Sequence, residues 1–591
     1  MKVGYTLAWV ALLGMQSVSA SAADGVVRPN QVHQRITGFG ASSAWYTPDL
    51  SDADADLLFT TDSGVGFTLL RVRIPPGGCS PPQETCEVAT ALKAQARGAS
   101  VWATPWSPPA LWKSNGSVNN GGKLLAAHAD DWANALAAYV QWMQGQGVSI
   151  TRLSAQNEPT TVVSYESCVY TPATLADFIG NHLAPAFRAA KLSTTLVGPE
   201  TQDWATLPSF GDAILGNSAA AAAVSAVATH SYGKASPAAY APAAQAMKEL
   251  WETEVYDPSK TPDPGIGSGL RVAVMMQQAL VNANVNAWHY WWIRPAGSGN
   301  GALWDSMTNA PTKRLYAMGN YSRFVRPGFV RVDTSATGPT PGVTFSAYVD
   351  PQSMKLVIVA INQNSSPVSQ RFLFDGVTVG SWTSWVTSAT ENSTSSGTPV
   401  TGSCNAVDGG SEGEAGDGAS PAEGGSDAAG DDGSPADSGS DVGDDGGDAI
   451  EGGSVPVEGG SALVEGGSVP VEGGSVPVEG GSVPVEGGCN ASALTVTLEA
   501  QSVTTFQGLV TGVGPSLPAS VSAPAQQSAG GAASGGGGDS TGGAESSGCA
   551  CDLARGRGEK AGWAAALGVA FAVSFAGRRR RQRRGAVRVC S

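Results

Sequence analysis

Positive charge is scarce in this chain of 591 residues, which has 34 Lys and Arg against 50 Asp and Glu. Residues 405–488 hold 19 of the acidic residues and no Lys or Arg. Because this segment is more negative than the whole chain, whose net charge is −16, the rest of the chain is nearly neutral. This balance excludes a nucleic-acid-binding protein that depends on a basic face. Histidine is also rare: the five His are scattered, and we expect neither a metal nor an organic cofactor.

Both ends of the chain have features of targeting signals. After Lys2, residues 5–18 are apolar and an Ala-Ser-Ala cleavage pattern follows, which predicts a secretory signal peptide over residues 1–22. Near the other end, the apolar run 561–577 is followed at once by six Arg within seven residues. The run is short for a membrane span, but the Arg cluster is typical of a cytoplasmic stop. We therefore expect an exported protein.

Residues 549–591 resemble the C-terminal sorting signal of many myxobacterial surface proteins. The resemblance rests on Gly548-Cys549-Ala550-Cys551, the apolar run and the Arg cluster, in that order. It implies processing near Cys549 or Cys551 and anchoring at the cell surface or outer membrane. The alternative is a basic amphipathic tail without a membrane role.

Two low-complexity segments interrupt the second half of the chain. Residues 404–488 form an acidic segment in which Glu-Gly-Gly-Ser-Val-Pro-Val repeats from Glu451 onward. Because each repeat contains Gly-Gly and Pro, a continuous helix is excluded and an extended spacer is expected. Residues 511–548 are a Gly/Ser-rich linker. Neither segment carries catalytic side chains.

The cysteines agree with this layout. Cys79 and Cys86 lie in a Pro-rich loop, and Cys404 and Cys489 stand on either side of the acidic spacer. In an exported chain we expect both pairs, Cys79–Cys86 and Cys404–Cys489, to be disulfides, the second holding the base of the spacer. Cys168 is left as a buried free thiol.

Strand-like and helical segments alternate through the first part of the chain. Continuous apolar runs are typical of parallel strands covered on both faces, and segments such as 130–144 and 174–190 have helical spacing. Eight repeats of this alternation predict a (β/α)8 barrel over residues 23–326. The eight expected strands are Ile36–Trp45, Phe67–Ile74, Ser100–Trp106, Ile150–Asn157, Thr194–Pro199, Ala226–Tyr232, Glu249–Glu254 and Val285–Ile293.

After Pro327 the pattern changes to strand-like alternation, which continues beyond the acidic spacer. It predicts an antiparallel β-sandwich side module formed by residues 327–403 plus 489–510, with which the first residues of the barrel segment are expected to pair. The expected strands are Val343–Val349, Lys355–Asn362, Phe372–Phe374, Trp382–Thr387, Leu494–Leu498 and Ser502–Phe506.

Catalytic side chains of such a barrel sit where its strands end. Glu158 follows the fourth strand and Glu254 ends the seventh, so the two carboxylates are expected to face each other across the mouth. Two acids surrounded by Trp side chains, which stack on sugar rings, indicate glycoside cleavage. Other strand ends supply Arg71, Trp106, Asn157, His230, Tyr232 and Trp291.

An ordered set of segments resembles glycoside hydrolase family 30, and within it the bacterial xylanase branch, subfamily 8, whose members include glucuronoxylanases. The segments are Gly38–Trp45, Leu69–Ile74, Thr104–Pro109, Gln156–Pro159, Leu250–Tyr256, Arg323–Arg331 and Ala500–Phe506. The similarity covers about residues 30–403 and 489–508.

The resemblance implies a retaining mechanism in which Glu158 is the general acid/base and Glu254 the nucleophile. It implies that Asn157 hydrogen-bonds the 2-hydroxyl of the sugar. The substrate-binding residues would be Trp45, Arg71, Trp106, Asn157, His230, Tyr232, Tyr256, Trp291 and Arg294.

One departure from the family pattern concerns the substrate. Members that require a glucuronate branch have two Arg after the Trp of the eighth strand, and here the run is Trp292-Ile293-Arg294-Pro295. Without the second Arg, a bidentate grip on a carboxylate is lost. The sequence therefore predicts a secreted, surface-anchored endo-β-1,4-xylanase with weak glucuronate dependence, and we expect a monomer.

Other functions stay open. A glucuronate-specific xylanase, a β-1,6-glucanase and a glucosylceramidase-like enzyme are alternatives within the family. A surface protein that binds glycans without cleaving them is an alternative from another class.

Overall fold

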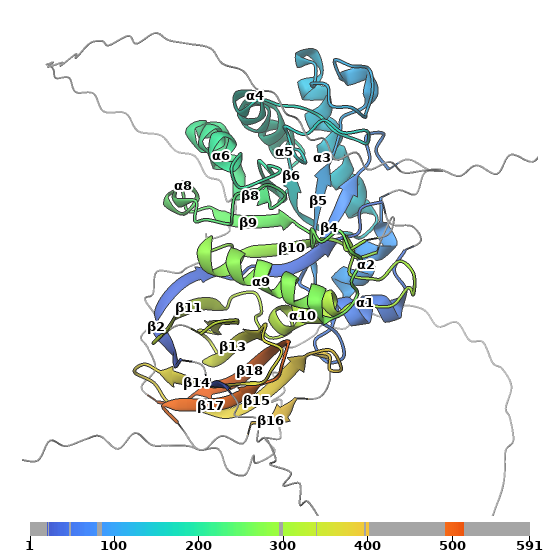
Figure 1. Ribbon diagram of the computed structural model, residues 1–591. Helices are drawn as coiled ribbons and strands as arrows, with labels where there is room; N and C mark the ends of the chain where they lie inside the picture. Colours follow the sequence, from blue (N-terminus) through green and yellow to red (C-terminus); the bar gives the residue numbers. More distant parts are fainter. Residues whose placement is uncertain are drawn as a thin grey trace, which may run out of the picture. The chain divides into compact units, whose positions relative to one another are not determined.

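The computed structural model (Figure 1) describes residues 20–21, 23–45, 49–79, 86–294, 299–338, 340–394, 397–400 and 491–512. The acidic spacer, the Gly/Ser linker, the sorting signal, most of the signal peptide and the pair Cys404–Cys489 lie outside these residues. Within the described part of the chain, no helix has the length and apolar character needed to cross a membrane.

Eight parallel strands close into a barrel in the order β10-β3-β4-β5-β6-β7-β8-β9. All eight predicted strands are confirmed, most of them one to three residues shorter than expected at an end. The strands are Gly38–Ser42 (β3), Leu69–Ile74 (β4), Ser100–Pro105 (β5), Ile150–Ser154 (β6), Thr195–Val197 (β7), Val224–His230 (β8), Glu249–Glu254 (β9) and Ala287–Trp292 (β10).

Helices cover the outside of the barrel, as in a TIM barrel. The predicted helices at 130–144 and 174–190 are confirmed, the second as a continuous run of α4 (Pro172–Asp177), a π-helical segment (Phe178–Leu183) and α5 (Ala184–Ala189). The helices are Asp52–Phe59 (α1), Val88–Ala96 (α2), Ala129–Gly145 (α3), Pro172–Asp177 (α4), Ala184–Ala189 (α5), Leu207–Gly216 (α6), Ser218–Ala223 (α7), Ala241–Gln245 (α8), Ile266–Asn282 (α9) and Lys313–Ser322 (α10).

Sequence features explain where the helices begin and which face they bury. The hydroxyl of Ser51 accepts a hydrogen bond from the backbone N–H of Asp54 and caps α1. Helix α3 buries Trp132, Leu136 and Val140, which recur at helical spacing toward the strands.

Large and small side chains alternate inside the barrel. Trp102 and Trp251 lie with ring centroids 5.7 Å apart, and His289 lies between 5 and 6 Å from each. Small residues from other strands, including Ala226 and Ala228, complete this cluster. The interior is therefore a packed core, so the site must lie at the barrel's rim.

A second, mostly antiparallel sheet forms the β-module, in the order β1-β14-β2-β11-β12-β13-β18-β15-β16, with β17 on β14. Its strands are Ala20–Ser21 (β1), Gly25–Arg35 (β2), Val330–Ala336 (β11), Val343–Val349 (β12), Lys355–Asn362 (β13), Val368–Phe374 (β14), Val379–Thr387 (β15), Thr398–Pro399 (β16), Ala493–Leu498 (β17) and Ser502–Val510 (β18).

Three predictions about this module can be compared with its pairing. The first residues of the barrel segment do join it, because β2 pairs with β11 and β14. The strands on both sides of the acidic spacer belong to one sheet, since β18 lies between β13 and β15. The sheet is mostly antiparallel, as predicted, and β14 departs from this by running parallel to β1 and β2.

Helices α9 and α10 lie between the barrel and the β-module (Figure 1). Gln277 of α9 donates to the carbonyl oxygen of Phe345 at 2.7 Å, and Asn320 of α10 donates to the Thr505 hydroxyl at 3.0 Å. Asn320 and Thr505 are fully buried. Polar side chains thus bridge the two parts inside their shared core.

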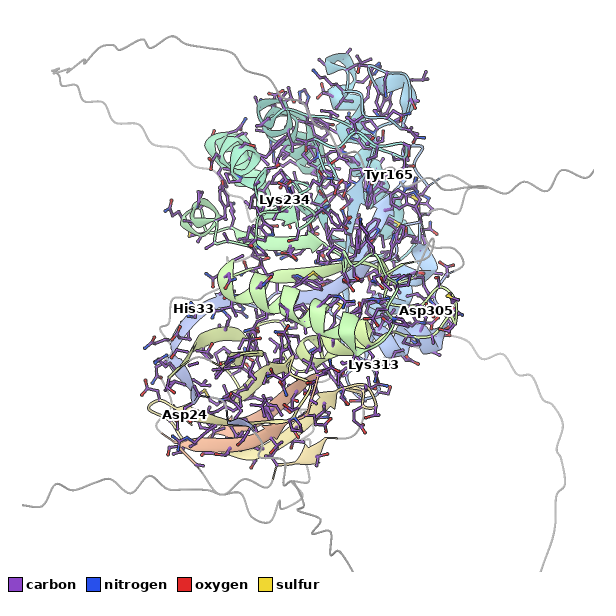
Figure 2. All side chains as sticks on the ribbon, in the orientation of Figure 1. Asp24, His33, Tyr165, Lys234, Asp305 and Lys313 are labelled. Carbon is purple, nitrogen blue, oxygen red and sulfur yellow. A yellow bond between two sulfur atoms is a disulfide. The ribbon has the colours of Figure 1, made fainter. Side chains whose placement is uncertain are left out.

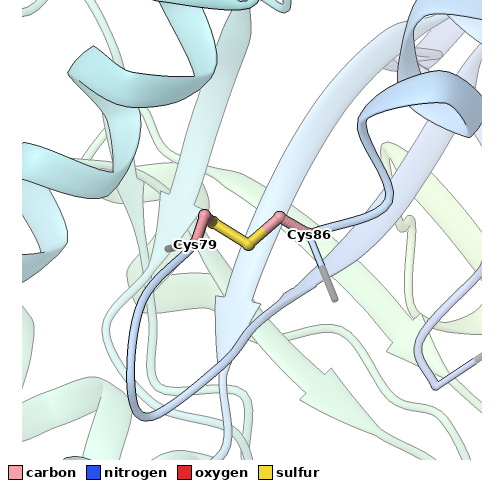
Figure 3. Close-up of a disulfide and its surroundings, with 2 residues drawn as sticks. All are labelled: Cys79 and Cys86. Carbon is pink, nitrogen blue, oxygen red and sulfur yellow. A yellow bond between two sulfur atoms is a disulfide. The ribbon is translucent and has the colours of Figure 1, made fainter. Parts of the chain in front are cut away.

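Cys79 and Cys86 form the predicted disulfide, which closes a loop between β4 and α2 (Figure 3). Their Cα atoms are 5.7 Å apart, within the usual range for a disulfide. Cys168 is a buried free thiol, as expected.

Candidate active site

Two buried carboxylates face each other at the carboxyl ends of β6 and β9. Glu158 lies four residues beyond β6 with a left-handed backbone (φ 43°), and Glu254 is the last residue of β9. One oxygen from each carboxylate and one ring nitrogen of His230 lie within 4.8 Å of one another. The structure therefore brings together the acids that the strand ends predicted.

His230, the last residue of β8, lies between the acids. Its Nδ1 is 3.0 Å from Glu158 Oε1, and its Nε2 is 3.5 Å from Glu200 Oε1 and 3.9 Å from Glu254 Oε2. Burial alone would lower the pKa of His230, but the three carboxylates outweigh it and raise this pKa to about 9. The imidazole is thus protonated at neutral pH.

Arg71 of β4 links Glu254 to Asn157 and to a third acid, Glu200. It donates to Glu254, to Asn157 Oδ1 at 2.8 Å and to Glu200 Oε1 at 2.9 Å, while its Nε lies 3.2 Å from the hydroxyl of Thr104. Although burial opposes the charged form, Glu200 and Glu254 raise the pKa of Arg71 further. A permanently charged guanidinium thus fixes the positions of Glu254, Glu200 and Asn157.

Glu200 is a site residue that the sequence reading missed. It is fully buried beneath Arg71 and His230. Burial would raise the pKa of this carboxyl, but Arg71 and His230 lower it to about 2. The signal was available, because Glu200 directly follows the Pro199 at which the fifth strand was predicted to end.

Glu254 also accepts a hydrogen bond from the hydroxyl of Tyr232 at 2.7 Å. Burial raises the pKa of Glu254, and the charge of Glu158 adds to this, although His230 and Arg71 act in the opposite direction. Tyr256, with its ring centroid 5.2 Å from that of Tyr232, extends this side of the site. Both predicted tyrosines are therefore beside the nucleophile candidate.

Indole rings form the opposite wall. The ring centroids of Trp45 and Trp106 are 4.8 Å apart, and that of Trp291 is 6.0 Å from each. Arg71 lies 4.7 Å from the Trp106 centroid, which joins the wall to the acids. Tyr165, labelled in Figure 2, is 50% exposed and lies 6.2 Å from Trp45; the sequence reading missed it.

Comparison with known proteins decides the family. The family model described as "Glycosyl hydrolase family 30 TIM-barrel domain" matches residues 85–259. The glucuronoxylanase XynC of Bacillus subtilis is 31% identical over 403 residues, an alignment that covers 66% of this chain and 90% of that protein. The chain belongs to glycoside hydrolase family 30. This family 30 protein is therefore a glycoside hydrolase, as the paired acids indicated.

Two further glycoside hydrolases are similar to the family 30 enzyme. A subfamily 8 xylanase from Clostridium acetobutylicum superposes with a TM-score of 0.60 at 28% identity, over 82% of this chain and 99% of that one. The mouse lysosomal acid glucosylceramidase is 25% identical over 408 residues, covering 58% of this chain and 78% of that protein.

Glu252 of the family 30 enzyme is separated from the site by a strand irregularity. Residues two apart in a regular strand share a face, but the pairing of β8 with β9 shifts register between Thr229 and His230. Glu252 instead accepts hydrogen bonds from the indoles of Trp204 (3.2 Å) and Trp288 (2.8 Å). Burial raises the pKa of Glu252 to about 8.

Arg294 is the predicted site residue that the structure does not bring to the others. Its guanidinium hydrogen-bonds Asp54 of α1 and Asn309, and it lies 4.6 Å from the ring centroid of Trp304. The side chain is only 8% exposed. Its partners therefore hold it away from the catalytic acids.

Glu158, His230 and Glu254 have a geometry that could hold a metal ion. The donor chemistry does not fit one. Arg71 and Tyr232 already donate hydrogen bonds to Glu254, and a protonated imidazole has no lone pair to offer a metal. These side chains suit acid/base and nucleophilic roles better.

Proposed function

We propose that the chain is a retaining endo-β-1,4-xylanase that hydrolyses plant xylan. The observation that carries the proposal is the carboxylate pair: one oxygen of Glu158 and one oxygen of Glu254 lie within 4.8 Å of each other. Retaining glycosidases hold their two carboxyl groups roughly 5–5.5 Å apart, because the nucleophile must reach the sugar without an intervening water.

In this mechanism Glu254 attacks the anomeric carbon while Glu158 donates a proton to the leaving glycosidic oxygen. The bond from the sugar to that oxygen breaks, and a glycosyl ester forms on Glu254. Glu158, now ionised, takes a proton from water, which attacks the anomeric carbon; the bond from the sugar to Glu254 breaks and the carboxylate is restored. Arg71 and Tyr232 aim the attacking carboxylate, and Asn157 is available to the 2-hydroxyl.

The printed names of the xylanase relatives support xylan as the substrate class. Weak dependence on glucuronate is supported by Arg294, whose guanidinium is engaged by Asp54 and Asn309. Pro295, which stands in place of the second Arg, lies outside the described residues. The similarity to a glucosylceramidase keeps another β-glycosidase as the second candidate.

We also propose that the enzyme is secreted and anchored at the cell surface or outer membrane. The apolar N-terminal segment, the Cys549 and Cys551 region and the terminal Arg cluster support this. The exported enzyme would act as a monomer on a polysaccharide outside the cell.

The secreted chain incubated separately with four polymers tests the substrate. These are glucuronoxylan, unbranched xylo-oligosaccharides, arabinoxylan and a β-1,6-glucan, with products sized by mass spectrometry. Cleavage of unbranched or arabinose-bearing xylan is expected. Cleavage restricted to glucuronoxylan would overturn the weak dependence, cleavage of the glucan alone would replace the substrate, and binding without cleavage would favour the non-catalytic alternative.

A further inference from the structure

Glu200 is a fully buried acid that the proposed mechanism leaves without a step. It lies three residues beyond β7, and its neighbours Arg71, Thr104 and His230 are fully buried as well. Burying a carboxylate costs free energy unless charged or hydrogen-bonding partners compensate for it. Because an unexposed side chain does not touch a sugar in the open site, a role of Glu200 must act through these neighbours.

The Glu200 carboxylate holds Arg71 at two points. Arg71 Nη2 donates to Glu200 Oε1 at 2.9 Å. The hydroxyl of Thr104 donates to Glu200 Oε2 at 3.1 Å and accepts from Arg71 Nε at 3.2 Å, so it bridges the two charged groups. The same guanidinium donates to Glu254 and to Asn157. The direction in which Arg71 presents itself to the nucleophile is therefore fixed from the side of Glu200.

Glu200 also contacts the acid/base side of the site in two ways. Its Oε1 lies 3.5 Å from Nε2 of His230, whose Nδ1 is 3.0 Å from Glu158 Oε1. Its backbone carbonyl oxygen accepts from the N–H of Glu158 at 3.0 Å. Both glutamates have a left-handed backbone, with φ of 52° and 43°. Such conformations cost free energy in residues with a side chain and are concentrated at functional sites.

Glu200 supplies a fixed negative charge beside two buried cations. Although burial opposes ionisation, Arg71 and His230 lower the pKa of Glu200 to about 2, so it is a carboxylate at neutral pH. Two cations that faced only the catalytic acids would drive off the proton that one of those acids must carry. Glu200 offsets one of the two charges, which leaves a proton available for the leaving group.

Other titratable groups face this cluster from neighbouring elements. Glu254 Oε2 lies 3.9 Å from His230 Nε2, and the ring of Tyr232 lies 5.8 Å from that of His230. Glu252 of β9 and His289 of β10 interact with the cluster electrostatically. Burial raises the pKa of Glu252 to about 8, and burial with the nearby guanidinium lowers that of His289 to about 3. Both are therefore mostly uncharged in slightly acidic solution.

We propose that Glu200 is a positioning residue of the hydrolytic reaction, which fixes Arg71 and His230 beneath the catalytic acids and balances their charge. It touches neither the sugar nor the reacting atoms. The inference deepens the proposed function, on which it rests, because it assigns the alignment of Glu254 and Glu158 to a third acid.

Glu200→Gln in the full secreted chain tests the proposal, since it keeps the size of the side chain and removes its charge. We expect kcat on unbranched xylo-oligosaccharides to fall roughly 10- to 100-fold, as for a displaced catalytic group. KM should stay within about twofold, because no contact to the substrate is lost. The pH profile of kcat/KM should move to lower pH by about one unit, because loss of a negative charge lets the remaining groups release their protons more readily.

Two further variants separate charge from position. Glu252→Gln is the matched control, because it makes the same substitution at a buried acid that is mostly uncharged, and it should leave the pH profile in place. Glu200→Asp keeps the charge but withdraws it by one methylene group, and it should lower kcat without moving the profile. If Glu200→Gln is insoluble, Thr104→Val removes only the bridging hydroxyl and should lower kcat roughly three- to tenfold, as for one lost hydrogen bond.

NMR of the histidine-labelled chain gives a readout that needs no substrate, with His230→Gln to assign the signal. The imidazole of His230 should lose its proton about one pH unit lower in Glu200→Gln than in the parent enzyme. A Glu200→Gln enzyme that differs from the parent only in melting temperature, with the same kcat, pH profile and His230 titration, would overturn the proposal. A parent chain that cleaves no xylan while the His230 titration shifts as expected would instead count against the proposed function.

Discussion

Two fully buried histidines in the same barrel hold different charges. His230 is surrounded by Glu158, Glu200 and Glu254, and its pKa is raised to about 9. His289 has Arg71 nearby instead, and burial together with that charge lowers its pKa to about 3. Its Nε2 lies 3.0 Å from the indole Nε1 of Trp102, which can donate to it. The charge of a buried histidine here follows from the sign of its neighbours.

This contrast predicts a pH-dependent stability. A His whose pKa is higher in the folded than in the unfolded state stabilises the fold when it is protonated. The stabilisation is complete below the pKa of the unfolded chain, about 6.5, and is lost as the pH rises through the pKa of the folded state. For His230→Gln the loss in unfolding free energy should be larger by on the order of 2 kcal/mol at pH 7.5 than at pH 10. Urea unfolding between pH 7.5 and 10 measures it.

His289→Gln is the matched control for that series. His289 is neutral in the folded state throughout this range, and an unfolded His is also neutral there. The difference in stability between this variant and the parent enzyme should therefore be flat with pH. A slope equal to that of His230→Gln would contradict the assignment of charge.

Glu254 and Glu252 form a second contrasting pair, because substitution of the first should affect turnover and substitution of the second should affect stability. Glu254→Gln removes the nucleophile and should reduce the turnover of xylan by roughly 10³-fold or more. Glu252→Gln should leave turnover within roughly threefold but lower the melting temperature, because one of the bonds from Trp204 and Trp288 is lost. Initial rates and thermal unfolding separate the two effects.

The residue scale also shows where a sequence can and cannot reveal a site. Glu158 and Glu254 could be predicted because each stands at the end of an apolar strand. Glu200 has the same signal, since it directly follows the predicted end of the fifth strand at Pro199, yet the list of candidate site residues does not include it. The direction of Arg294 depends on Asp54, 240 residues away in the chain, and no local pattern carries that information.

At the scale of elements, continuous apolar runs were sufficient to place all eight barrel strands. Several features escaped this reasoning, among them strand β11 and a register shift between two barrel strands. Strand β11 was not predicted, because its outer residues from Asp333 onward are only half buried and lack a clear alternation. The register shift between β8 and β9 could not be read either, because it depends on how two strands meet and not on either strand alone.

Strands β17 and β18 predict a difference between two deletions. Replacing residues 401–490 by a flexible Gly/Ser linker should leave the melting temperature and xylan hydrolysis unchanged, because both ends of the β-module are retained. Ending the chain at residue 403 removes β18, which hydrogen-bonds β13 and β15 on its two sides, and should give insoluble protein. Soluble yield and circular dichroism measure the outcome. A soluble, active truncated chain would contradict this role of β18.

At the scale of the whole molecule, the barrel and the β-module share buried polar contacts. Asn320 and Thr505, which are 185 residues apart, exchange hydrogen bonds across the junction at 3.0 and 2.6 Å. The strand–helix alternation before Pro327 and the strand-like alternation after it predicted a barrel and a separate β-module. The contacts that couple them could not be predicted, since isolated Asn and Thr residues carry no pairing signal.

This coupling predicts that both parts unfold together. Asn320→Ala should destabilise the chain by about 1–3 kcal/mol, because a buried hydrogen-bond donor is removed from its partners. Calorimetry should show a single main transition that moves down by a few degrees. The exposed Asn181→Ala, which loses one surface bond to Asp177, should leave the transition in place. Two separate transitions, only one of them shifted, would contradict the coupling.

The position of β18 in the sheet also has a consequence during synthesis. Strands β13 and β15 are complete by residue 387, but the strand that lies between them ends at residue 510. At about 5–20 residues per second, a ribosome takes roughly 6–25 s to make the intervening stretch. For that time the nascent module has two unpaired strand edges. A factor that shields such edges until the last residues emerge would therefore determine how much active enzyme a cell obtains.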